Sequence, residues 1–226
     1  MADTSVRPSD LRLLLRELPV LTGSAPTTAA DNFPAGPVEA FSTWLHEAVR
    51  LGVPEPHAMT LATTAADGGP DTRVLLLKDV DERGWHFAID ADSPKGRQLQ
   101  ETPRAALNFY WPSLTRQVRV RGPVRQLPAA EAAADFLARP EQSRINALAS
   151  LQSERMDGPG QLSERLSAAR STVTADPDHV LPSWHLYAVE PVSVELWQGS
   201  PDRNHVRIRY SRTSAQDAWR KERLWP

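Results

Sequence analysis

The sequence predicts a mainly β protein with flanking helices, an α+β chain whose strands form a barrel or a sandwich. Seven or more short apolar segments follow one another at the spacing of hairpins, with turn residues between them. Few helical segments interrupt them, and the strict alternation of strand and helix that builds a doubly wound fold is absent. The 226 residues suffice for one large domain or two small ones.

The N-terminal part of the chain differs in composition from the rest. We expect residues 1–36 to form a mobile arm and residues 37–226 to form the folded domain. Within the arm, Asp10–Glu17 favours a short helix, whereas residues 21–36 are rich in Thr, Ala, Pro and Gly. The domain begins with a helix over residues 37–52, where apolar residues recur at helical spacing between an initial Pro and a final Gly.

Alternating or continuous apolar runs predict the strands. We expect them at Ala58–Thr63, Thr72–Lys78, Trp85–Ile89, Ala105–Trp111, Arg116–Arg121, Pro123–Leu127, Trp184–Val189, Ser193–Trp197 and His205–Arg212. The run Thr72–Lys78 is almost entirely apolar, so both of its faces are expected to be buried. Further helices are expected after Ser93-Pro94, over Ala129–Ala138 and over Ser143–Leu151 with Ser143 as N-cap, and a loose helix and loop over 154–182.

Bulk composition excludes several classes of function. The 26 basic and 28 acidic residues nearly cancel, so no global attraction to nucleic acid or to an acidic membrane is expected. The absence of cysteine excludes disulfides, thiolate nucleophiles and Cys-ligated metals. The six histidines lack metal-ligand spacing, and no dinucleotide, P-loop or nucleophile-elbow motif occurs. Without a secretory signal or a membrane-spanning run, a cytoplasmic protein is expected.

Two groups of cations have both a structural and a functional interpretation. Arg73 and Lys78 flank an apolar run; they either reach solvent from the strand ends or mark the rims of a flat, anionic ligand. Lys95 and Arg97 lie in the first turn of a predicted helix, where positive charge opposes the helix dipole. A bound phosphate would explain them, and solvation is the alternative.

A third group of cations is spaced by two residues. Arg203, His205 and Arg207 would share one face of a strand, so we expect an electron-rich or anionic partner to face them. On another predicted strand, the outward positions Arg119 and Arg121 favour a solvated barrel exterior.

Eight segments, taken in order, resemble the pyridoxamine 5′-phosphate oxidase family, which are FMN enzymes of the split-barrel fold. The segments are RVLLLK (73–78), SPKGRQ (93–98), RQV (116–118), ARPEQS (138–143), LQSE (151–154), ELWQG (195–199), DRNHVR (202–207) and AWRKERLWP (218–226). The resemblance covers about residues 37–226. It implies an FMN-binding split β-barrel and a homodimer with FMN at the subunit interface.

The resemblance also implies site residues. The positions matching flavin contacts are Arg73, Val74, Leu75, Leu76, Leu77, Lys78, Ala88, Ile89, Lys95, Gln117, Gln152, Ser153, Trp197 and Arg207. The positions matching substrate contacts are Lys78, Asp135, Arg139, Ser143, Arg203 and His205, of which Arg203 and His205 are also the catalytic pair. No metal ligand is implied. Capping of the helices is the alternative interpretation of Arg139, Ser143, Gln152 and Ser153.

The implied function is an FMN-dependent oxidase that converts pyridoxamine or pyridoxine 5′-phosphate to pyridoxal 5′-phosphate, with dioxygen as acceptor and hydrogen peroxide as product. The sequence departs from the family pattern at Pro94, Asn204 and Val206, and Asp135 stands in place of a tyrosine that helps hold the substrate phosphate. The family's Arg-Tyr lid is also missing from the arm. Two alternatives follow: oxidation of a dihydro-aromatic intermediate of phenazine biosynthesis, or a non-catalytic split barrel that binds flavin, deazaflavin or haem.

Overall fold

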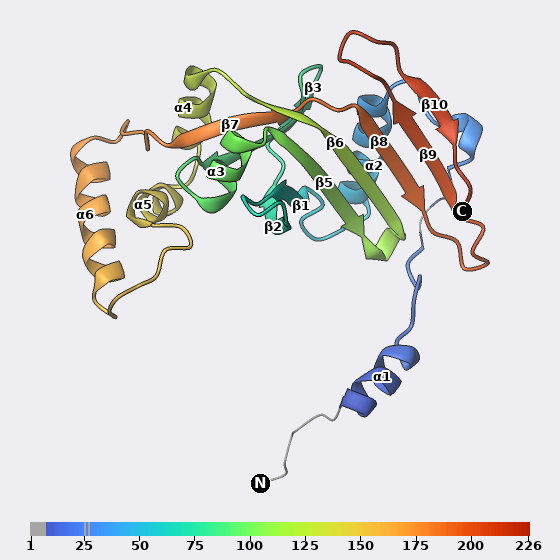
Figure 1. Ribbon diagram of the computed structural model, residues 1–226, viewed down its shortest axis with the longest axis horizontal. Helices are drawn as coiled ribbons and strands as arrows, with labels where there is room; N and C mark the ends of the chain where they lie inside the picture. Colours follow the sequence, from blue (N-terminus) through green and yellow to red (C-terminus); the bar gives the residue numbers. More distant parts are fainter. Residues whose placement is uncertain (1–7, 25, 27) are drawn as a thin grey trace.

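A ten-stranded antiparallel sheet, curled into a half-barrel, forms most of the molecule (Figure 1). The computed structural model describes residues 8–24, 26 and 28–226. The helices are α1 (Pro8–Glu17), α2 (Pro37–Arg50), α3 (Pro94–Glu101), α4 (Ala129–Leu137), α5 (Glu141–Ala149) and α6 (Gln161–Ala175). The strands are β1 (Ala58–Thr64), β2 (Pro70–Leu76), β3 (Asp79–Asp81), β4 (Gly84–Asp90), β5 (Arg104–Trp111), β6 (Arg116–Gln126), β7 (Trp184–Val189), β8 (Ser193–Gln198), β9 (Val206–Ser211) and β10 (Arg220–Arg223). The predicted mainly β architecture with flanking helices is confirmed.

Strand β6 joins the two parts of the sheet. Hydrogen bonds connect seven strands in the order β10-β9-β8-β6-β5-β1-β2, and β7, β4 and β3 branch from this path at β6. Residues Arg116–Arg121 of β6 pair with β8, and residues Val124–Gln126 pair with β7. In Figure 1 the helices α4, α5 and α6 lie at the β7 end, far from β9 and β10.

A glycine allows β6 to change partners. At Gly122 an added Cβ would lie 1.9 Å from the carbonyl oxygen of Glu190, in the connection between β7 and β8. The carbonyls on either side are held by the same connection, because Val192 N donates to Arg121 O (3.0 Å) and Glu190 N donates to Pro123 O (2.9 Å). Pro123, which cannot donate to a ladder, occupies the position where the pairing changes.

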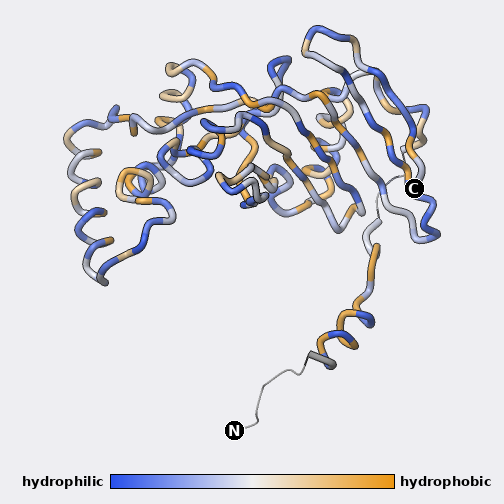
Figure 2. The backbone as a smooth tube through the Cα atoms, viewed as in Figure 1, coloured by the Kyte–Doolittle hydropathy of each residue, from blue (hydrophilic) through white to orange (hydrophobic). Residues whose placement is uncertain are grey.

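Helix α2 fills the interior of the half-barrel with aromatic side chains. Phe41 is fully buried, and its ring lies 5.5 Å from that of Trp85 and 4.9 Å from that of Phe109. These side chains belong to a helix and two strands that are distant in the sequence, so the helix and the sheet share one core. Figure 2 shows the corresponding alternation of hydrophobic and hydrophilic residues along the strands.

A buried arginine ties the segment before α2 to β6. Arg116 is fully buried; its Nη1 donates to Glu47 Oε2 (2.6 Å), its Nη2 donates to Pro26 O (2.9 Å), and its Cζ lies 4.5 Å from the ring centroid of Trp44. A buried guanidinium needs such partners, because an unpaired charge is costly to desolvate.

Other contacts in the predicted arm lie close to α2. Phe33 is buried, Tyr210 Oη donates to Pro34 O (2.7 Å), and Lys221 Nζ donates to Phe33 O (2.8 Å). Residues 1–7, 25 and 27 of the arm lie outside the described residues, and the mobility of the arm stays a prediction. Within the described part of the chain, no helix combines the length and apolar character needed to cross a bilayer.

Several elements differ from the sequence prediction. The two strands expected over residues 116–127 are one strand, because Pro123 lies where β6 changes partners and loses no ladder bond. Residues 161–175 form a regular helix, which packs on α5 through Ala169 and Val173. Helix α5 begins at Glu141 with Pro140 at the N-cap, so the expected cap at Ser143 is wrong. The strands β3 and β10 were not expected.

The prediction that both faces of the Thr72–Lys78 strand are buried is also wrong for the single chain. Strand β2 ends at Leu76 and lies at an edge of the sheet, with Val74 67 % exposed and Leu76 45 % exposed. Leu75 packs against the core from the other face. Apolar side chains exposed together on a sheet edge are typical of a surface that another chain covers.

We predict that Gly122→Ala destabilises the fold by about 2–4 kcal/mol, because the methyl group and the Glu190 carbonyl cannot occupy the same space. The matched control is Gly158→Ala, where an added Cβ meets no atom within 4 Å; its effect should stay below about 0.5 kcal/mol. Urea unfolding followed by circular dichroism measures both. Equal stability of the two variants would contradict the role given to Gly122.

Candidate active site

The beginning of α3 gathers polar groups around a lysine. Ser93 is the N-cap; its Oγ accepts from Gly96 N (3.4 Å) and donates to Asp90 O (2.6 Å). Lys95 Nζ donates to Ser93 Oγ (3.0 Å) and to Gln152 Oε1 (2.5 Å), a residue 57 positions further along the chain. The structure therefore brings together three predicted flavin-binding residues: Lys95, Gln152 and its neighbour Ser153.

A second cation, Arg73 of β2, lies close to Lys95. Its guanidinium donates to Thr63 Oγ1 (2.5 Å), Asp71 Oδ2 (2.5 Å) and Gln98 Oε1 (3.3 Å), so three elements fix its position. Burial and then the positive charge of Arg73 lower the pKa of Lys95. Two cations held close together at the positive end of a helix dipole are suited to a bound anion such as a phosphate.

Another cluster joins the segment after β2 to α4, the residues that follow α4, and the start of β7. Lys78 Nζ is 2.9 Å from Asp135 Oδ1, and Trp184 Nε1 donates to Asp135 Oδ2 (2.9 Å). Arg139 Cζ lies 4.2 Å from the ring centroid of Trp184, and burial lowers the pKa of Arg139. The buried Arg139 Nη1 has no hydrogen-bond partner among the described residues, so the protein leaves this donor unsatisfied. Ser143 lies in the first turn of the neighbouring helix α5.

The remaining predicted residues of this part differ in what they can offer a ligand. Val74 and Leu76 are exposed, whereas Leu77 belongs to the core. Ala88 packs beside α4. Ile89 is 2 % exposed within the core, so only its backbone could contact a flavin.

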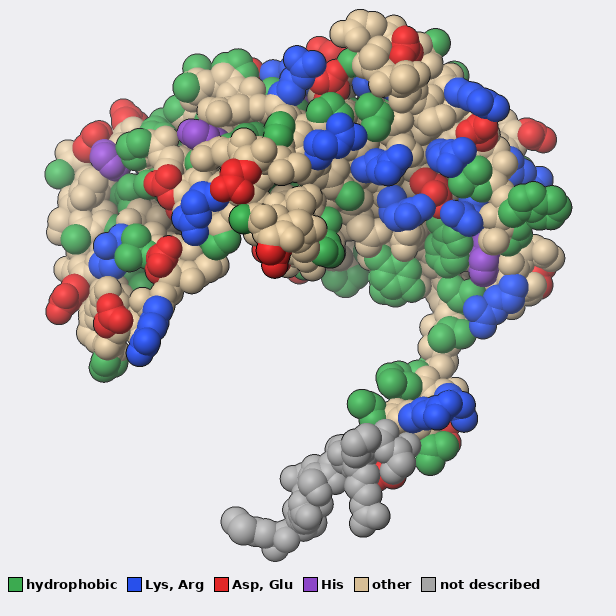
Figure 3. Space-filling model, viewed as in Figure 1, with side chains coloured by type: hydrophobic (Ala, Val, Ile, Leu, Met, Phe, Trp, Pro, Cys, Tyr) green, Lys and Arg blue, Asp and Glu red, His purple; other side chains and the backbone are tan. Residues whose placement is uncertain are grey.

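The other predicted residues lie on the outer face of the sheet. Registered positions place Tyr110, Gln117, Trp197 and Arg207 in one row across β5, β6, β8 and β9. All four line one pocket. Figure 3 shows Lys and Arg side chains gathered over β6, β8 and β9, with an acidic side chain among them.

The acidic partner expected near the basic turn is part of the protein. Glu195 of β8 is almost fully buried; its carboxylate accepts from Arg207 Nη2 (2.8 Å) and from Arg119 Nη2 (2.5 Å). The anionic partner that the spacing predicted for Arg207 is thus a residue of the protein. Arg119 is 53 % exposed, as expected for the exterior of the barrel, and it pairs with the same carboxylate. Glu195 lies in the ELWQG segment, but no spacing rule had singled it out.

Arg203 and His205 lie in the turn before β9 rather than on its face. Arg203 is exposed and has a left-handed backbone conformation (φ 68°), so the three basic residues do not share one strand face as predicted. The ring of His205 lies 4.9 Å from that of Trp197, and its Nδ1 accepts from Ser200 N (3.1 Å). The turn therefore orders His205 and leaves the Arg203 side chain extended into solvent.

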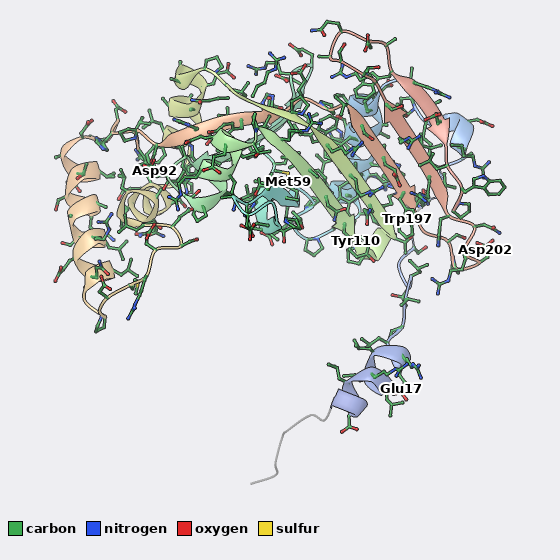
Figure 4. All side chains as sticks on the ribbon, viewed as in Figure 1. Glu17, Met59, Asp92, Tyr110, Trp197 and Asp202 are labelled. Carbon is green, nitrogen blue, oxygen red and sulfur yellow. The ribbon has the colours of Figure 1, made fainter. Side chains whose placement is uncertain are left out.

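The predicted site residues thus form two groups. The first-group residues come from β2, β4, α3, α4, α5 and the segment that follows; the second-group residues come from β6, β8, β9 and the turn. No hydrogen bond or ion pair recorded for the described residues joins the groups. In Figure 4 Asp92, next to α3, and Trp197 lie well apart on the ribbon. Within the described part of one chain, the two groups therefore stay apart.

Some residues that build the site were missed. Thr63, Asp71 and Gln98 position Arg73, and Trp184 positions Asp135. Of these residues, only Asp71 could have been identified from sequence spacing, because it lies two residues before Arg73 and therefore on the same strand face.

One acidic cluster was not expected from histidine spacing. Ligand atoms of Asp79, Asp81 and His86 lie within 4.8 Å of one another. Arg83 already donates to Asp81 (2.8 Å) and to Glu131 (2.9 Å), so a cation of the protein balances this charge. We assign no metal to it.

Comparison with known proteins agrees with this arrangement. The family model of pyridoxamine 5′-phosphate oxidase matches residues 45–180, and that of the pyridoxine 5′-phosphate oxidase C-terminal dimerisation region matches residues 184–226. A pyridoxine/pyridoxamine 5′-phosphate oxidase of Salinibacter ruber is 43 % identical over 87 % of this chain and 92 % of its own length. One from Azorhizobium caulinodans is 39 % identical over the whole of both chains.

Among solved structures, PhzG from Burkholderia lata 383 in complex with tetrahydrophenazine-1-carboxylic acid is similar, with a TM-score of 0.82 and 28 % identity over 91 % of this chain and all of its own. This similarity confirms the predicted split-barrel fold. Residues 45–180, which contain the α3 cations, and residues 184–226, which contain Trp197 and Arg207, thus match two models of related description. The chain belongs to the pyridoxamine 5′-phosphate oxidase family of oxidoreductases.

Proposed function

We propose that this chain is an FMN-dependent oxidase that converts pyridoxine 5′-phosphate or pyridoxamine 5′-phosphate to pyridoxal 5′-phosphate, using dioxygen and releasing hydrogen peroxide. The names of relatives at 39–43 % identity support this substrate class. The observation that carries the proposal is a pair of cations, Lys95 in the first turn of α3 and Arg73 of β2 beside it. Burial, and then the charge of Arg73, lower the pKa of Lys95, and its ammonium donates to two neutral oxygens, which favours an anion between the two cations.

The flavin phosphate fits this position. Lys95 is held by neutral acceptors, the hydroxyl of Ser93 and the amide of Gln152, so its charge remains available for a phosphate. Arg73 would contact the same flavin from β2, with Lys78 in the short segment between β2 and β3. The exposed side chains of Val74 and Leu76 would contribute apolar contact.

The second group of residues would come from a second copy of the chain. The match to a dimerisation region over residues 184–226 supports a homodimer, as do the exposed apolar residues of β2. In this arrangement Gln117, Trp197 and Arg207 of one protomer would complete the flavin site built around Lys95 of its partner.

Bound FMN would supply the redox chemistry, taking a hydride from the carbon that bears the amine or alcohol and passing the electrons to dioxygen. The protein's contribution is binding and orientation. Arg139, with its free Nη1, and Ser143 would hold the anionic group of the substrate. Arg203 and His205 would hold the ring; because His205 Nδ1 accepts from Ser200 N, the proton of the neutral imidazole lies on Nε2.

A second candidate keeps the flavin and changes the substrate. Asp135 neutralises Lys78 at the substrate end, which is unfavourable for a phosphate. The structural similarity to PhzG, whose structure holds a tetrahydrophenazine carboxylic acid, favours a dihydro-aromatic carboxylate as the alternative.

The assay for the proposed function is peroxide release from the purified flavoprotein with pyridoxine 5′-phosphate and with pyridoxamine 5′-phosphate. We expect one equivalent of peroxide for each pyridoxal 5′-phosphate formed, and flavin released by heat should elute as FMN. Turnover of a dihydrophenazine carboxylate without turnover of either phosphate would favour the second candidate. A colourless protein that binds no added FMN would reject both.

We predict that Lys95→Met weakens FMN binding about 10- to 100-fold, because it removes a charge-assisted contact to the phosphate. Arg97→Met is the matched control: it removes a cation from the same helix, but Arg97 is exposed and its guanidinium donates to Asp92 O. Quenching of flavin fluorescence on titration into the apoprotein gives both affinities. An equal loss in the two variants would mean that only the overall charge of the helix matters.

We predict that two defective chains restore activity when they assemble together. Lys95→Met damages the first group of residues and Arg203→Ala damages the second. Co-expression with different tags should give heterodimers with one intact site each, and about a quarter of wild-type activity in a random mixture. If both groups served the same chain's site, the mixture would show only the sum of the two residual activities.

A further inference from the structure

The predicted substrate end of the site contains a carboxylate, that of Asp135, at a position where an anionic substrate would be repelled. Asp135 is mostly buried between Lys78 Nζ at 2.9 Å and Trp184 Nε1 at 2.9 Å, so both of its oxygens have partners. Arg139 lies over the ring of Trp184, with its Cζ 4.2 Å from the ring centroid. The nearby charges are therefore two cations and one anion, a net charge of +1.

We propose that Asp135 is a specificity-determining residue that sets this subsite to accept a singly charged oxyanion, either a carboxylate or the monoanion of a phosphate ester, in preference to a phosphate dianion. This inference rests on the proposed function, because it concerns the substrate of the same site. The ion pair neutralises Lys78, and Arg139 with its free Nη1 remains as the cation that binds the ligand.

The physical reason is charge balance in a partly buried space. A phosphate monoester loses its second proton near pH 6, so it is mostly a dianion at neutral pH. A dianion beside Asp135 is repelled about twice as strongly as a monoanion at the same distance, because Coulomb energy is proportional to the charge of the ligand. Removal of the Asp135 charge should therefore favour a dianion more than a monoanion.

Other charged groups near Asp135 already have partners. On the same helix, Glu131 pairs with Arg83 (2.9 Å). On β7, His185 Nδ1 lies 3.3 Å from Tyr187 Oη. Burial lowers the pKa of Arg139 and the charge of Asp135 opposes this effect, so Asp135 acts on both cations of the subsite. The geometry also supplies a conservative variant: Asn at position 135 keeps an oxygen that can accept from Trp184 Nε1.

The test compares wild-type protein with Asp135→Asn by isothermal titration calorimetry, using pyridoxal 5′-phosphate and phenazine-1-carboxylate as probes at pH 5.5 and pH 8.0. For each probe at each pH, we compare the dissociation constants of the two proteins as a ratio. Protonation of the probe's ring affects both constants equally and so cancels from the ratio. At pH 8.0 the variant should bind the phosphate about tenfold more tightly than wild type, and at pH 5.5 about threefold. The carboxylate should gain about threefold at both pH values.

The matched control is Glu131→Gln, which removes a carboxylate from the same helix outside the subsite; its ratios should stay near one. A double variant, Lys78→Gln with Asp135→Asn, keeps the net charge at +1 and should bind the phosphate within threefold of wild type. A large loss in the double variant would overturn the proposal, because it would show that Lys78 itself binds the phosphate. An unchanged phosphate affinity in Asp135→Asn at pH 8.0 would overturn it as well.

Calorimetry separates this proposal from the proposed function, because it requires neither flavin nor turnover. Protein that binds the phosphate but oxidises no vitamer would reject the proposed function, while the ratios would still decide the role of Asp135. If circular dichroism shows that Asp135→Asn does not fold, the double variant decides. Its two introduced amide side chains, at positions 78 and 135, can hydrogen-bond to each other in place of the ion pair.

Discussion

The change of pairing partner along β6 is the constraint on which the arrangement of the site depends. Residues before Gly122 pair with β8, and residues after it pair with β7, because only a residue without a side chain lets the Glu190 carbonyl approach so closely. The row of Trp197 belongs to the first part of the sheet and the Trp184 cluster to the second. The change of partners at Gly122 thus separates the Trp197 row from the Trp184 cluster, whereas Arg73 on β2 lies at the far edge of the same seven-strand path as the row.

The two ends of the first group hold their lysines differently. Lys95 donates to a hydroxyl and an amide, which position it but leave its charge unbalanced. Lys78 is bound to a carboxylate, which positions it and cancels its charge. A phosphate is therefore favoured at α3 and disfavoured at Asp135. Under the proposed function, most departures from the family pattern, Asp135 among them, would lie at the substrate end, and Pro94 at the start of α3 is the exception.

The sequence predicted the strands and the local chemistry better than the long-range contacts. Alternation identified β5 and β8 closely, and the Ser93-Pro94 pair identified the start of α3. The single strand β6 was missed, since Pro123 reads as a strand boundary unless its position between two partners is known. Only the family resemblance implied that Gln152 contacts a flavin, because nothing in the sequence between positions 95 and 152 indicates that its amide meets Lys95.

The basic turn illustrates why charge spacing alone gave an incomplete answer. A spacing of two residues correctly implied that Arg207 needs an anionic partner, and that partner is Glu195 across the strand pair. The spacing rule does not apply to Arg203, because this residue itself has a left-handed backbone conformation and lies before the start of β9. With Arg207 and Arg119 balanced by Glu195, a flavin above this row would meet fixed guanidinium groups rather than free ones. Less ordering entropy would then be lost when the second protomer completes the site.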